Sequence, residues 1–317
     1  MRAHGSTGSR TGGGRRSAVG RRAAPLALAL VVSGLAACRA PDTPPPLTVM
    51  SFNIRYGTAD DGDDSWPHRR DLVWEVVERH APDVLAVQEA LRFQLDELHT
   101  AVQGYGEVGV GRDDGKEAGE YAAILVRDER LAVLESGTFW LSDTPDVPGS
   151  TSWGNRIPRI CTWARLQDRV SGRVFSVYNV HLDHESQPSR EESARALAAR
   201  LAQRPAGEPV IVLGDFNAGE DNLARRLLAA DGSVAAADTL PRHPALVDTY
   251  GLLRTATGGE GTFNGFIGDT TGERIDAILV SGDWMILGAA IDRTRRVGRY
   301  PSDHFPVTAV LAIAPSR

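Results

Sequence analysis

Cysteine, lysine and long apolar runs are all scarce in this sequence of 317 residues. With only 2 cysteines, Cys38 and Cys161, a disulfide-scaffold fold is excluded. Lys116 is the single lysine, so arginine carries almost all of the basic charge. Residues 23–37 carry no charge, but this stretch is short for a helix that spans a bilayer. The 42% hydrophobic content excludes an intrinsically disordered chain, and the length allows one large domain or two small ones.

Basic charge is concentrated at the amino terminus. The first 38 residues carry six arginines and no acidic residue, so the formal net charge of −6 becomes −12 for the remainder. An acidic body argues against a large electrostatic footprint for a polyanion such as long duplex DNA. We therefore expect any phosphate that the protein handles to need a bridging cation.

The amino terminus also has the pattern of an export signal. The charge-free stretch 23–37 follows arginine-rich residues and ends in Leu35, Ala36 and Ala37, directly before Cys38. This ending resembles the bacterial lipobox, in which the cysteine is acylated and becomes the first residue of the mature protein. The pattern predicts a lipoprotein that is anchored in the cell membrane and faces outside the cytoplasm. A plain secretory signal is the alternative, and without acylation of Cys38 the protein would be secreted.

From residue 47 onward, short apolar runs alternate with amphipathic runs of helical period. Strands are expected over 47–54, 83–89, 122–128, 131–141, 159–168, 173–182, 209–216, 273–281 and 304–313. Helices are expected over 65–80, 91–102 and 189–204, with Ser65 placed to cap the first. Several strands are apolar enough to be buried on both faces, so the pattern predicts a layered α/β protein.

Polar residues that can bind a metal ion or move a proton stand at one end of six of these apolar runs. They are Asn53, Glu89, His181 with Asp183 and His184, Asp215 with Asn217, Asp276, and Asp303 with His304. Any one of them alone would more often be a solvated or capped strand end. Because α/β sheets collect their sites at strand ends, we expect the six groups to converge.

These residue types restrict the chemistry. Oxygen ligands from Asn, Asp and Glu suit Mg²⁺, with Mn²⁺ or Ca²⁺ as alternatives, whereas zinc prefers clusters of His and Cys. The sequence contains no P-loop, no G-x-G-x-x-G after a strand and no G-x-S-x-G, which argues against nucleoside triphosphatases, dinucleotide enzymes and serine hydrolases. A Mg²⁺ ion held by carboxylates beside an Asp–His pair indicates hydrolysis at phosphorus.

The ordered motifs SFNIR, QE, HLD, GDFN, RID and SDH resemble the endonuclease/exonuclease/phosphatase superfamily, which has the deoxyribonuclease I-like fold. The resemblance covers residues 47–313, and segments such as SWPHRRDLV are similar to a bacterial branch described as metal-dependent hydrolases. It implies a four-layer α/β sandwich, in which two packed mixed β-sheets have helices outside and the site lies along one edge. We therefore predict a signal peptide over 1–38, a proline-rich tether over 39–46 and one domain over 47–317.

The resemblance implies a metal site and a catalytic set. Glu89 would be the principal Mg²⁺ ligand, with Asn53 and Asp303 beside the ion. The catalytic residues would be Asp215 and Asn217 at the attacking water and phosphate, His181 at the phosphate or leaving oxygen, and Asp276 supporting His304. The sequence leaves open whether Asp215 or His304 acts as the general base.

Four further residues are predicted to contact the substrate. Arg55 lies two residues after Asn53, which on a strand is the same face, and arginine can bind phosphate through two donors. Arg159 is chosen for the same chemistry, and His184 because HLDH ends a strand. Asn264 stands in GTFNGF, where related proteins often have histidine, although a turn role before Gly265 is an equal alternative.

These observations predict an exported, Mg²⁺-dependent phosphoesterase that we expect to be monomeric. Its substrate would be a phosphoester: a nucleic acid, a lipid head group or a soluble phosphorylated metabolite. The alternatives are an extracellular nuclease specifically, or a non-catalytic surface lipoprotein that keeps the fold as a scaffold for binding.

Overall fold

The computed structural model describes residues 44–229, 242–253 and 260–314. The chain divides into two compact units, Met1–Asp42 and Thr43–Arg317, and all of the helices and strands named below belong to the second unit. The predicted signal peptide, its Cys38 and most of the predicted tether lie outside the described residues, so they stay predictions. Within the described ranges, no helix is both long and apolar enough to cross a membrane.

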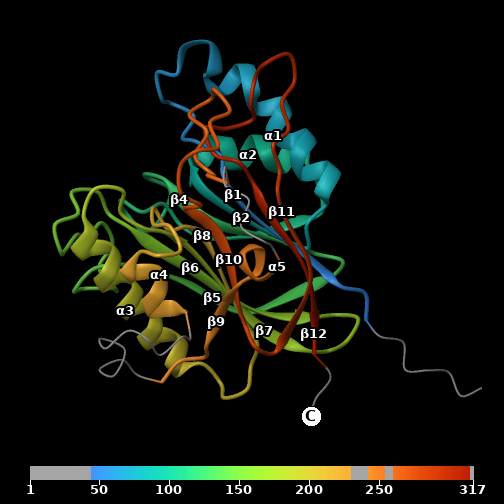
Figure 1. Ribbon diagram of the computed structural model, residues 1–317, viewed down its shortest axis with the longest axis vertical. Helices are drawn as coiled ribbons and strands as arrows, with labels where there is room; N and C mark the ends of the chain where they lie inside the picture. Colours follow the sequence, from blue (N-terminus) through green and yellow to red (C-terminus); the bar gives the residue numbers. More distant parts are fainter. Residues whose placement is uncertain (1–43, 230–241, 254–259, 315–317) are drawn as a thin grey trace, which may run out of the picture. The chain divides into compact units, whose positions relative to one another are not determined.

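Two six-stranded sheets form the second unit (Figure 1). In spatial order, the first sheet contains β11 (Trp284–Ile291), β12 (Val307–Ile313), β1 (Leu47–Asn53), β2 (Val84–Ala90), β4 (Tyr121–Arg127) and β3 (Tyr105–Val108). The second contains β5 (Leu131–Trp140), β6 (Ile160–Asp168), β7 (Val174–His181), β8 (Val210–Asp215), β10 (Asp276–Ser281) and β9 (Leu246–Asp248).

Both sheets are mixed, and each has one parallel pair at its centre. β1 runs parallel to β2, and β7 runs parallel to β8, whereas all other neighbours are antiparallel. In register, Asn53 lies opposite Gln88 and His181 lies opposite Asp215. Because the carboxyl ends of parallel strands meet at one edge, this topology gathers the polar strand ends of each sheet in one place.

Helices cover the outer face of each sheet (Figure 1). α1 (Trp66–His80) and α2 (Arg92–Ala101) share an apolar cluster with β1, β2 and β4, whereas α3 (Gln187–Gln203) and α4 (Leu223–Leu228) share one with β7 and β8. The short α5 (Thr249–Leu253) and the 3₁₀ turn η1 (Gly62–Asp64) complete the helices of the described residues. The four-layer α/β sandwich predicted from the sequence is confirmed.

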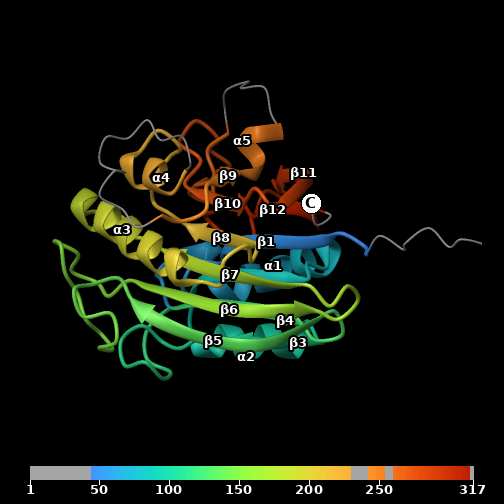
Figure 2. The same cartoon turned by 90° about the horizontal axis from the view of Figure 1, so that it is seen from below.

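The two inner sheet faces pack directly on each other. Their apolar side chains form one cluster, in which the rings of Phe175 and Trp284 meet edge to face at 5.2 Å. A buried polar link crosses the same layer, because Gln88 Nε2 donates to Asn179 Oδ1 at 2.7 Å and Asn179 Nδ2 donates to the carbonyl of Val87 at 3.0 Å. Figure 2 shows β5, β6, β7 and β8 side by side, with α3 along the outside. The sheets therefore form a rigid support next to the site.

The expected strands and the three expected helices are all present. The elements that the sequence did not predict are short or irregular. β3, β9, β11, α4 and α5 were not expected. The sequence of β11 does not alternate regularly between apolar and polar residues, because the register shifts between Ile286 and Gly288 and because β11 lies at the edge of its sheet. Ser65 precedes α1 as expected, but its side chain makes no capping hydrogen bond, and Pro67 in the first turn marks the helix start instead.

Candidate active site

Asn53, the last residue of β1, joins carboxylates from the two sheets. Its side chain is fully buried, and its Nδ2 donates to Glu89 Oε1 at 3.0 Å and to Asp215 Oδ2 at 3.1 Å. Its Oδ1 accepts from the backbone N–H of Arg55 at 3.0 Å. Asn53 therefore holds the two acids side by side, and its role as a metal ligand stays a prediction.

Glu89 is directed into the site by an irregularity of β2. The pairing of β2 with β4 shifts between Val87 and Ala90, and Glu89 within this bulge has a φ of 61°. Left-handed backbone is costly for a residue with a Cβ and is concentrated at functional sites. The bulge places the Glu89 carboxylate in the pocket, where Oε2 accepts from the backbone N–H of Tyr56 at 3.2 Å.

Asp215 ends β8 and is almost completely buried. The chain turns at Asn217, whose φ is 46°, and the Asn217 backbone N–H donates to Asp215 Oδ1 at 2.8 Å. Asn217 Nδ2 donates to the carbonyl of Leu182 at 2.9 Å, which fixes the turn against the end of β7. Burial, followed by the charge of Asp276, raises the pKa of Asp215 to about 7.

His304 lies between two carboxylates. Its Nδ1 is 2.8 Å from Asp276 Oδ2, and its Nε2 is 3.9 Å from Asp215 Oδ2. Burial of the ring opposes protonation, but the charges of Asp276 and Asp215 outweigh it and raise the pKa of His304 well above its usual value. Asp276 Oδ1 is buried and has no hydrogen-bond partner among the described residues. Asp276 therefore fixes the orientation of the ring and favours its protonated form, whereas the catalytic roles of the two residues stay predictions.

Arg159 is a buried hub for the histidines of β7 and the segment that follows it. Its Nε donates to Asp183 Oδ2 at 3.3 Å, its Nη1 lies 3.1 Å from His181 Nε2, and its Nη2 lies 2.6 Å from His184 Nδ1. Burial and then the charge of Arg159 lower the pKa of His181 well below its usual value. His181 Nε2 is also 3.7 Å from Asp215 Oδ2, so a neutral imidazole lies beside this carboxylate.

Arg55 and Asp303 lie on the side of the pocket formed by the first sheet. Arg55 donates to both carboxylate oxygens of Asp61, at 2.9 and 3.1 Å, and its Nε is 3.7 Å from Asp303 Oδ2. The strand-face argument for Arg55 is wrong, because β1 ends at Asn53 and Arg55 has a φ of 56°. Arg55 nevertheless lines the pocket. Burial raises the pKa of Asp303.

Two residues of the site, Arg112 and Glu120, were missed from the sequence. Both guanidinium Nη atoms of Arg112 donate to Glu120, each at 2.6 Å, and Glu120 Oε2 is 3.9 Å from His181 Nδ1. Burial raises the pKa of Glu120 to about 7, although the charge of Arg112 opposes this. A signal was present, since Glu120 directly precedes the buried strand β4, just as Glu89 and Asp215 stand at the ends of theirs.

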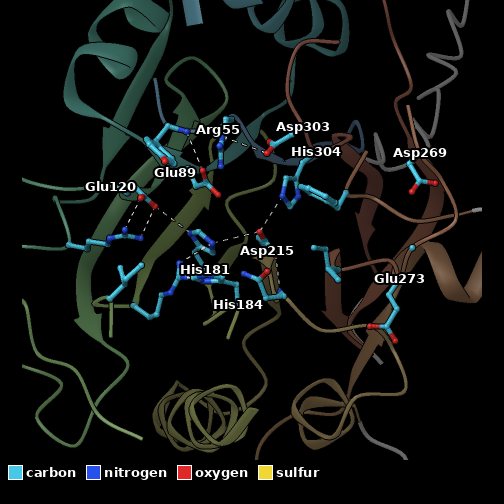
Figure 3. A pocket seen from close by; sticks show the side chains of 18 residues that line it. Arg55, Glu89, Glu120, His181, His184, Asp215, Asp269, Glu273, Asp303 and His304 are labelled. Atoms are coloured by element: carbon cyan, nitrogen blue, oxygen red, sulfur yellow. Dashed lines mark hydrogen bonds and ion pairs between the residues drawn. The ribbon is translucent and has the colours of Figure 1, made fainter. Parts of the chain in front are cut away.

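These side chains surround one cavity of about 590 Å³ (Figure 3). Nine of the twelve site residues predicted in the domain line it, and the others are Asn53, Asp276 and Asn264. Asn53 and Asp276 lie behind the lining and are hydrogen-bonded to it. The structure therefore brings eleven of the twelve together, and the exception is Asn264.

The prediction that Asn264 contacts the substrate has to be corrected. Its side chain is fully buried, with Nδ2 donating to the carbonyl of Ser302 at 3.1 Å and Oδ1 accepting from the backbone N–H of Phe266 at 2.9 Å. Its backbone N–H donates to the carbonyl of Asp303 at 2.6 Å. Because this amide group is used within the loop, the alternative of a turn residue is the one that the contacts support.

Two sets of side chains offer donors for a cation. Glu89 and Asp303 both line the cavity with carboxylate oxygens, the donors that hard divalent ions prefer. Asp215, Asp276 and His304 offer ligand atoms that all lie within 4.8 Å of one another. A protonated His304 has no free lone pair for a metal ion, so the carboxylates of Glu89 and Asp303 fit a hard cation better.

The protein is therefore an α/β sandwich of two sheets, in which acids and histidines gather at one cavity. The chain belongs to the Endonuclease/Exonuclease/phosphatase family, whose sequence pattern matches residues 50–304. Members of this family are hydrolases that act on phosphoester bonds.

Solved structures agree with this assignment. An endonuclease/exonuclease/phosphatase from Bacteroides vulgatus is 32% identical, with a TM-score of 0.75 over 84% of this chain and 99% of that chain. A mannosyl-6-phosphatase from Bacteroides thetaiotaomicron is 35% identical, with a TM-score of 0.73 over 84% of this chain and 100% of that chain.

Curated relatives are more distant. Human nocturnin is 25% identical over 232 residues, which are 61% of this chain and 51% of nocturnin. Across the curated relatives, this chain spans between 30% and 59% of their length.

Proposed function

We propose that this protein is a divalent-cation-dependent phosphoesterase that uses water to hydrolyse a phosphorylated small molecule outside the cytoplasm. The observation that carries the proposal is the position of Asp215 Oδ2, 3.9 Å from His304 Nε2 and 3.7 Å from His181 Nε2, at a cavity that Glu89 also lines. The cavity is therefore lined by an acceptor, by histidines that can exchange protons and by a carboxylate of the type that hard cations prefer, which supports hydrolysis of a phosphoester.

Asp215 is assigned to the attacking water. Its Oδ1 and Oδ2 already accept from the Asn217 backbone and from Asn53, so the carboxylate is fixed in orientation. A carboxylate that only accepts hydrogen bonds can align a water molecule and take its proton. Asn217, held by the carbonyl of Leu182, keeps the turn in place beside it.

His304 is assigned to the phosphate or the leaving oxygen. The two carboxylates that flank its ring favour the imidazolium form, and Asp276 fixes Nδ1 so that Nε2 faces the pocket. This arrangement supports His304 as the donor and Asp215 as the base, and we propose that assignment for the alternative left open by the sequence. His181, kept neutral by burial and by the charge of Arg159, would orient a phosphate oxygen.

A divalent cation held by Glu89 and Asp303 would neutralise negative charge on the phosphate. The body of the protein has a formal charge of −12, so its own surface provides little of this neutralisation. The ion is proposed to be Mg²⁺, with Mn²⁺ or Ca²⁺ as alternatives that titration of each metal would separate.

A small phosphorylated substrate is favoured over a nucleic acid. The mannosyl-6-phosphatase from Bacteroides thetaiotaomicron is 35% identical to this chain, whereas the 3'-5'-exoribonuclease subunit Ccr4 of Emericella nidulans is 20% identical. The acidic body of this chain also opposes long polyanions.

The first test measures hydrolysis of p-nitrophenyl phosphate and of bis-p-nitrophenyl phosphate by the purified full chain, with added Mg²⁺ or with EDTA. We expect turnover that EDTA removes. Glu89→Gln should lower activity sharply at low Mg²⁺ and regain part of it at high Mg²⁺, because the change removes a ligand charge but keeps the shape. Glu129→Gln, an exposed change in the turn after β4, is the control. Full activity of the wild type in EDTA would contradict the proposal.

Export and membrane anchoring belong to the same proposal and are supported by the sequence pattern that ends at Cys38. An acylated protein should partition into detergent, and Cys38→Ser should leave it soluble or unprocessed. Recovery of the wild type only in a soluble exported fraction would contradict the anchor and favour secretion.

A further inference from the structure

The pocket has two unlike walls. The arginine wall consists of Arg112, Glu120, Arg159, His181 and His184, and the acidic wall consists of Phe263, Asp269, Gly272, Glu273 and Ile275. Figure 3 shows Asp269 and Glu273 on the opposite side of the pocket from Glu120 and His184. Among the described residues that line the cavity, the arginines are Arg55, Arg112 and Arg159, so no cation stands in the acidic wall.

The carboxylates of the acidic wall are available to a ligand. Glu273 is exposed, and its carboxylate makes no hydrogen bond or ion pair within the described ranges. Asp269 is also exposed and uses Oδ1 to accept from the backbone and hydroxyl of Thr271, both at 2.8 Å, which leaves Oδ2. A carboxylate has only acceptors, so these two groups would take hydrogen bonds from hydroxyl donors.

Phe263 adds an apolar surface beside the reacting groups. Its side chain is 49% exposed, and its ring meets the His304 ring edge to face, with centroids 5.2 Å apart. A large aromatic ring left open at the edge of a polar pocket is a surface for the apolar face of a ligand.

Gly272 keeps this wall open. A Cβ placed on Gly272 would have no neighbouring atom within 4 Å, and the backbone there does not require glycine. A side chain at this position would therefore enter open space next to the cavity without disturbing the packed core.

We propose that the acidic wall binds the leaving group and that this group is an uncharged polyhydroxylated ring, as in a hexose phosphorylated on its exocyclic hydroxyl. The inference rests on the phosphoesterase function proposed above. Hydroxyls would donate to Asp269 and Glu273 while the C–H face of the ring covers Phe263. In the reaction, the oxygen of water bonds to phosphorus, the bond from phosphorus to the sugar oxygen breaks, and the sugar leaves with that oxygen protonated, together with inorganic phosphate.

The negative charge of the acidic wall favours an uncharged sugar over a nucleic acid, and the aromatic content of the wall disfavours a quaternary ammonium group. A nucleic acid would bring a second phosphate towards Asp269 and Glu273, and like charges at short range are repulsive. A quaternary ammonium group would be attracted by the acids, but such groups are usually held by several aromatic rings, and Phe263 is the single aromatic residue of this wall.

The activity test compares kcat/KM for mannose 6-phosphate, glucose 6-phosphate, phosphocholine, a short oligonucleotide and p-nitrophenyl phosphate. We expect a hexose phosphate to be the best natural-type substrate. In Asp269→Asn with Glu273→Gln, the ratio of kcat/KM for the hexose phosphate to that for p-nitrophenyl phosphate should fall about 10- to 100-fold, because hydrogen bonds to charged acceptors are lost. Glu129→Gln is the control and should keep the ratio.

A binding test does not depend on turnover. Calorimetric titration of mannose 6-phosphate without divalent cation should give binding to the wild type and to Gly282→Leu, and at least 10-fold weaker binding to Gly272→Leu. Gly282 also has open space around a Cβ but lies outside the pocket, so it is the matched control.

The outcomes separate the two proposals. Preference for phosphocholine or the oligonucleotide, or an unchanged ratio in the double variant, would overturn the acidic-wall proposal while the phosphoesterase stands. Hexose phosphate binding that Gly272→Leu abolishes, without hydrolysis of any phosphoester, would support the wall and overturn the phosphoesterase. Equal binding to Gly272→Leu and Gly282→Leu would also overturn the wall.

Discussion

The arginine wall and the acidic wall face the same cavity but hold their charges in opposite ways. On the arginine wall, the Arg159 side chain is 3% exposed and contacts Asp183, His181 and His184 at once. On the acidic wall, Glu273 is exposed and has no such partner in the described part of the chain. The first arrangement fixes geometry around the reacting atoms, whereas the second leaves acceptors free for a ligand.

This difference has an energetic consequence. A buried charge that loses its partner keeps its desolvation cost, so a change in a buried network destabilises the whole domain. An exposed acid is solvated with or without its neighbours, so it can be exchanged at little cost to folding. Specificity can therefore be altered at the acidic wall independently of the catalytic groups that both walls share.

The largest expected effect is at the shared catalytic groups. Asp215→Asn and His304→Ala should each lower kcat by about 10²- to 10⁴-fold or more, because each removes a group that we propose as general base or general acid. The combination of His304→Ala with Asp276→Ala should be less than additive, since Asp276 acts through the His304 ring. Steady-state kinetics with circular dichroism as the folding control measure this. Near-wild-type kcat in both single variants would show that Asp215 and His304 do not form the catalytic centre, and would contradict the proposed mechanism.

A smaller effect is expected on the free energy of unfolding, which variants in the two walls should change by different amounts. Arg159→Met should cost about 3–5 kcal/mol, because it leaves the Asp183 carboxylate buried without its guanidinium partner. Glu273→Gln should stay within about 0.5 kcal/mol of the wild type. Urea unfolding measures both free energies. Arg156→Met is the matched control, since Arg156 is exposed and pairs with Glu185 at the surface, and it should also change stability little. Equal losses for Arg159→Met and Arg156→Met would contradict the comparison.

The same comparison explains which parts of the site the sequence could predict. Three of the predicted site residues, Asn53, His181 and Asp215, stand at the ends of regular apolar strands and continue a pattern that is readable along the chain. Parallel pairing of β7 and β8 brings His181 and Asp215 together, and the packing of the two sheets brings Asn53 to Asp215. Four of the ordered motifs, SFNIR, QE, HLD and GDFN, indicated the fold for the same reason, because they mark the central strands β1, β2, β7 and β8.

Arg159, His181 and His184 of the arginine wall were predicted from the sequence. Arg112, Glu120 and the residues of the acidic wall were less predictable, because they come from loops and the segments that flank strands. Glu120 stands at a strand end but was hidden in a glycine-rich segment, and its partner Arg112 lies eight positions away across a turn. Phe263 and Asn264 are neighbours in the chain, yet the first faces the cavity and the second is buried in the loop. No periodic pattern distinguishes such neighbours, since the loop conformation alone decides which one faces the ligand.

The smallest expected effect concerns acid stability. The Asp183 carboxylate accepts from the backbone N–H groups of Glu185 and Ser186 and pairs with Arg159. Burial opposes its ionisation, but these partners outweigh burial and lower its pKa. A carboxyl with a lowered folded-state pKa adds stability that is complete above its unfolded pKa of about 3.9 and is lost as the pH falls through the folded value.

The stability difference between the wild type and Asp183→Asn should therefore be largest at neutral pH and should shrink below about pH 4. Urea unfolding at pH 7, 5, 4 and 3 measures this difference. Asp269→Asn on the acidic wall is the matched control: the pKa of Asp269 is also lowered, by its hydrogen bonds to Thr271, but this group is solvated and should add no measurable pH dependence of stability. A constant difference for Asp183→Asn across this range would show that shape, and not charge, is what Asp183 contributes to the arginine wall.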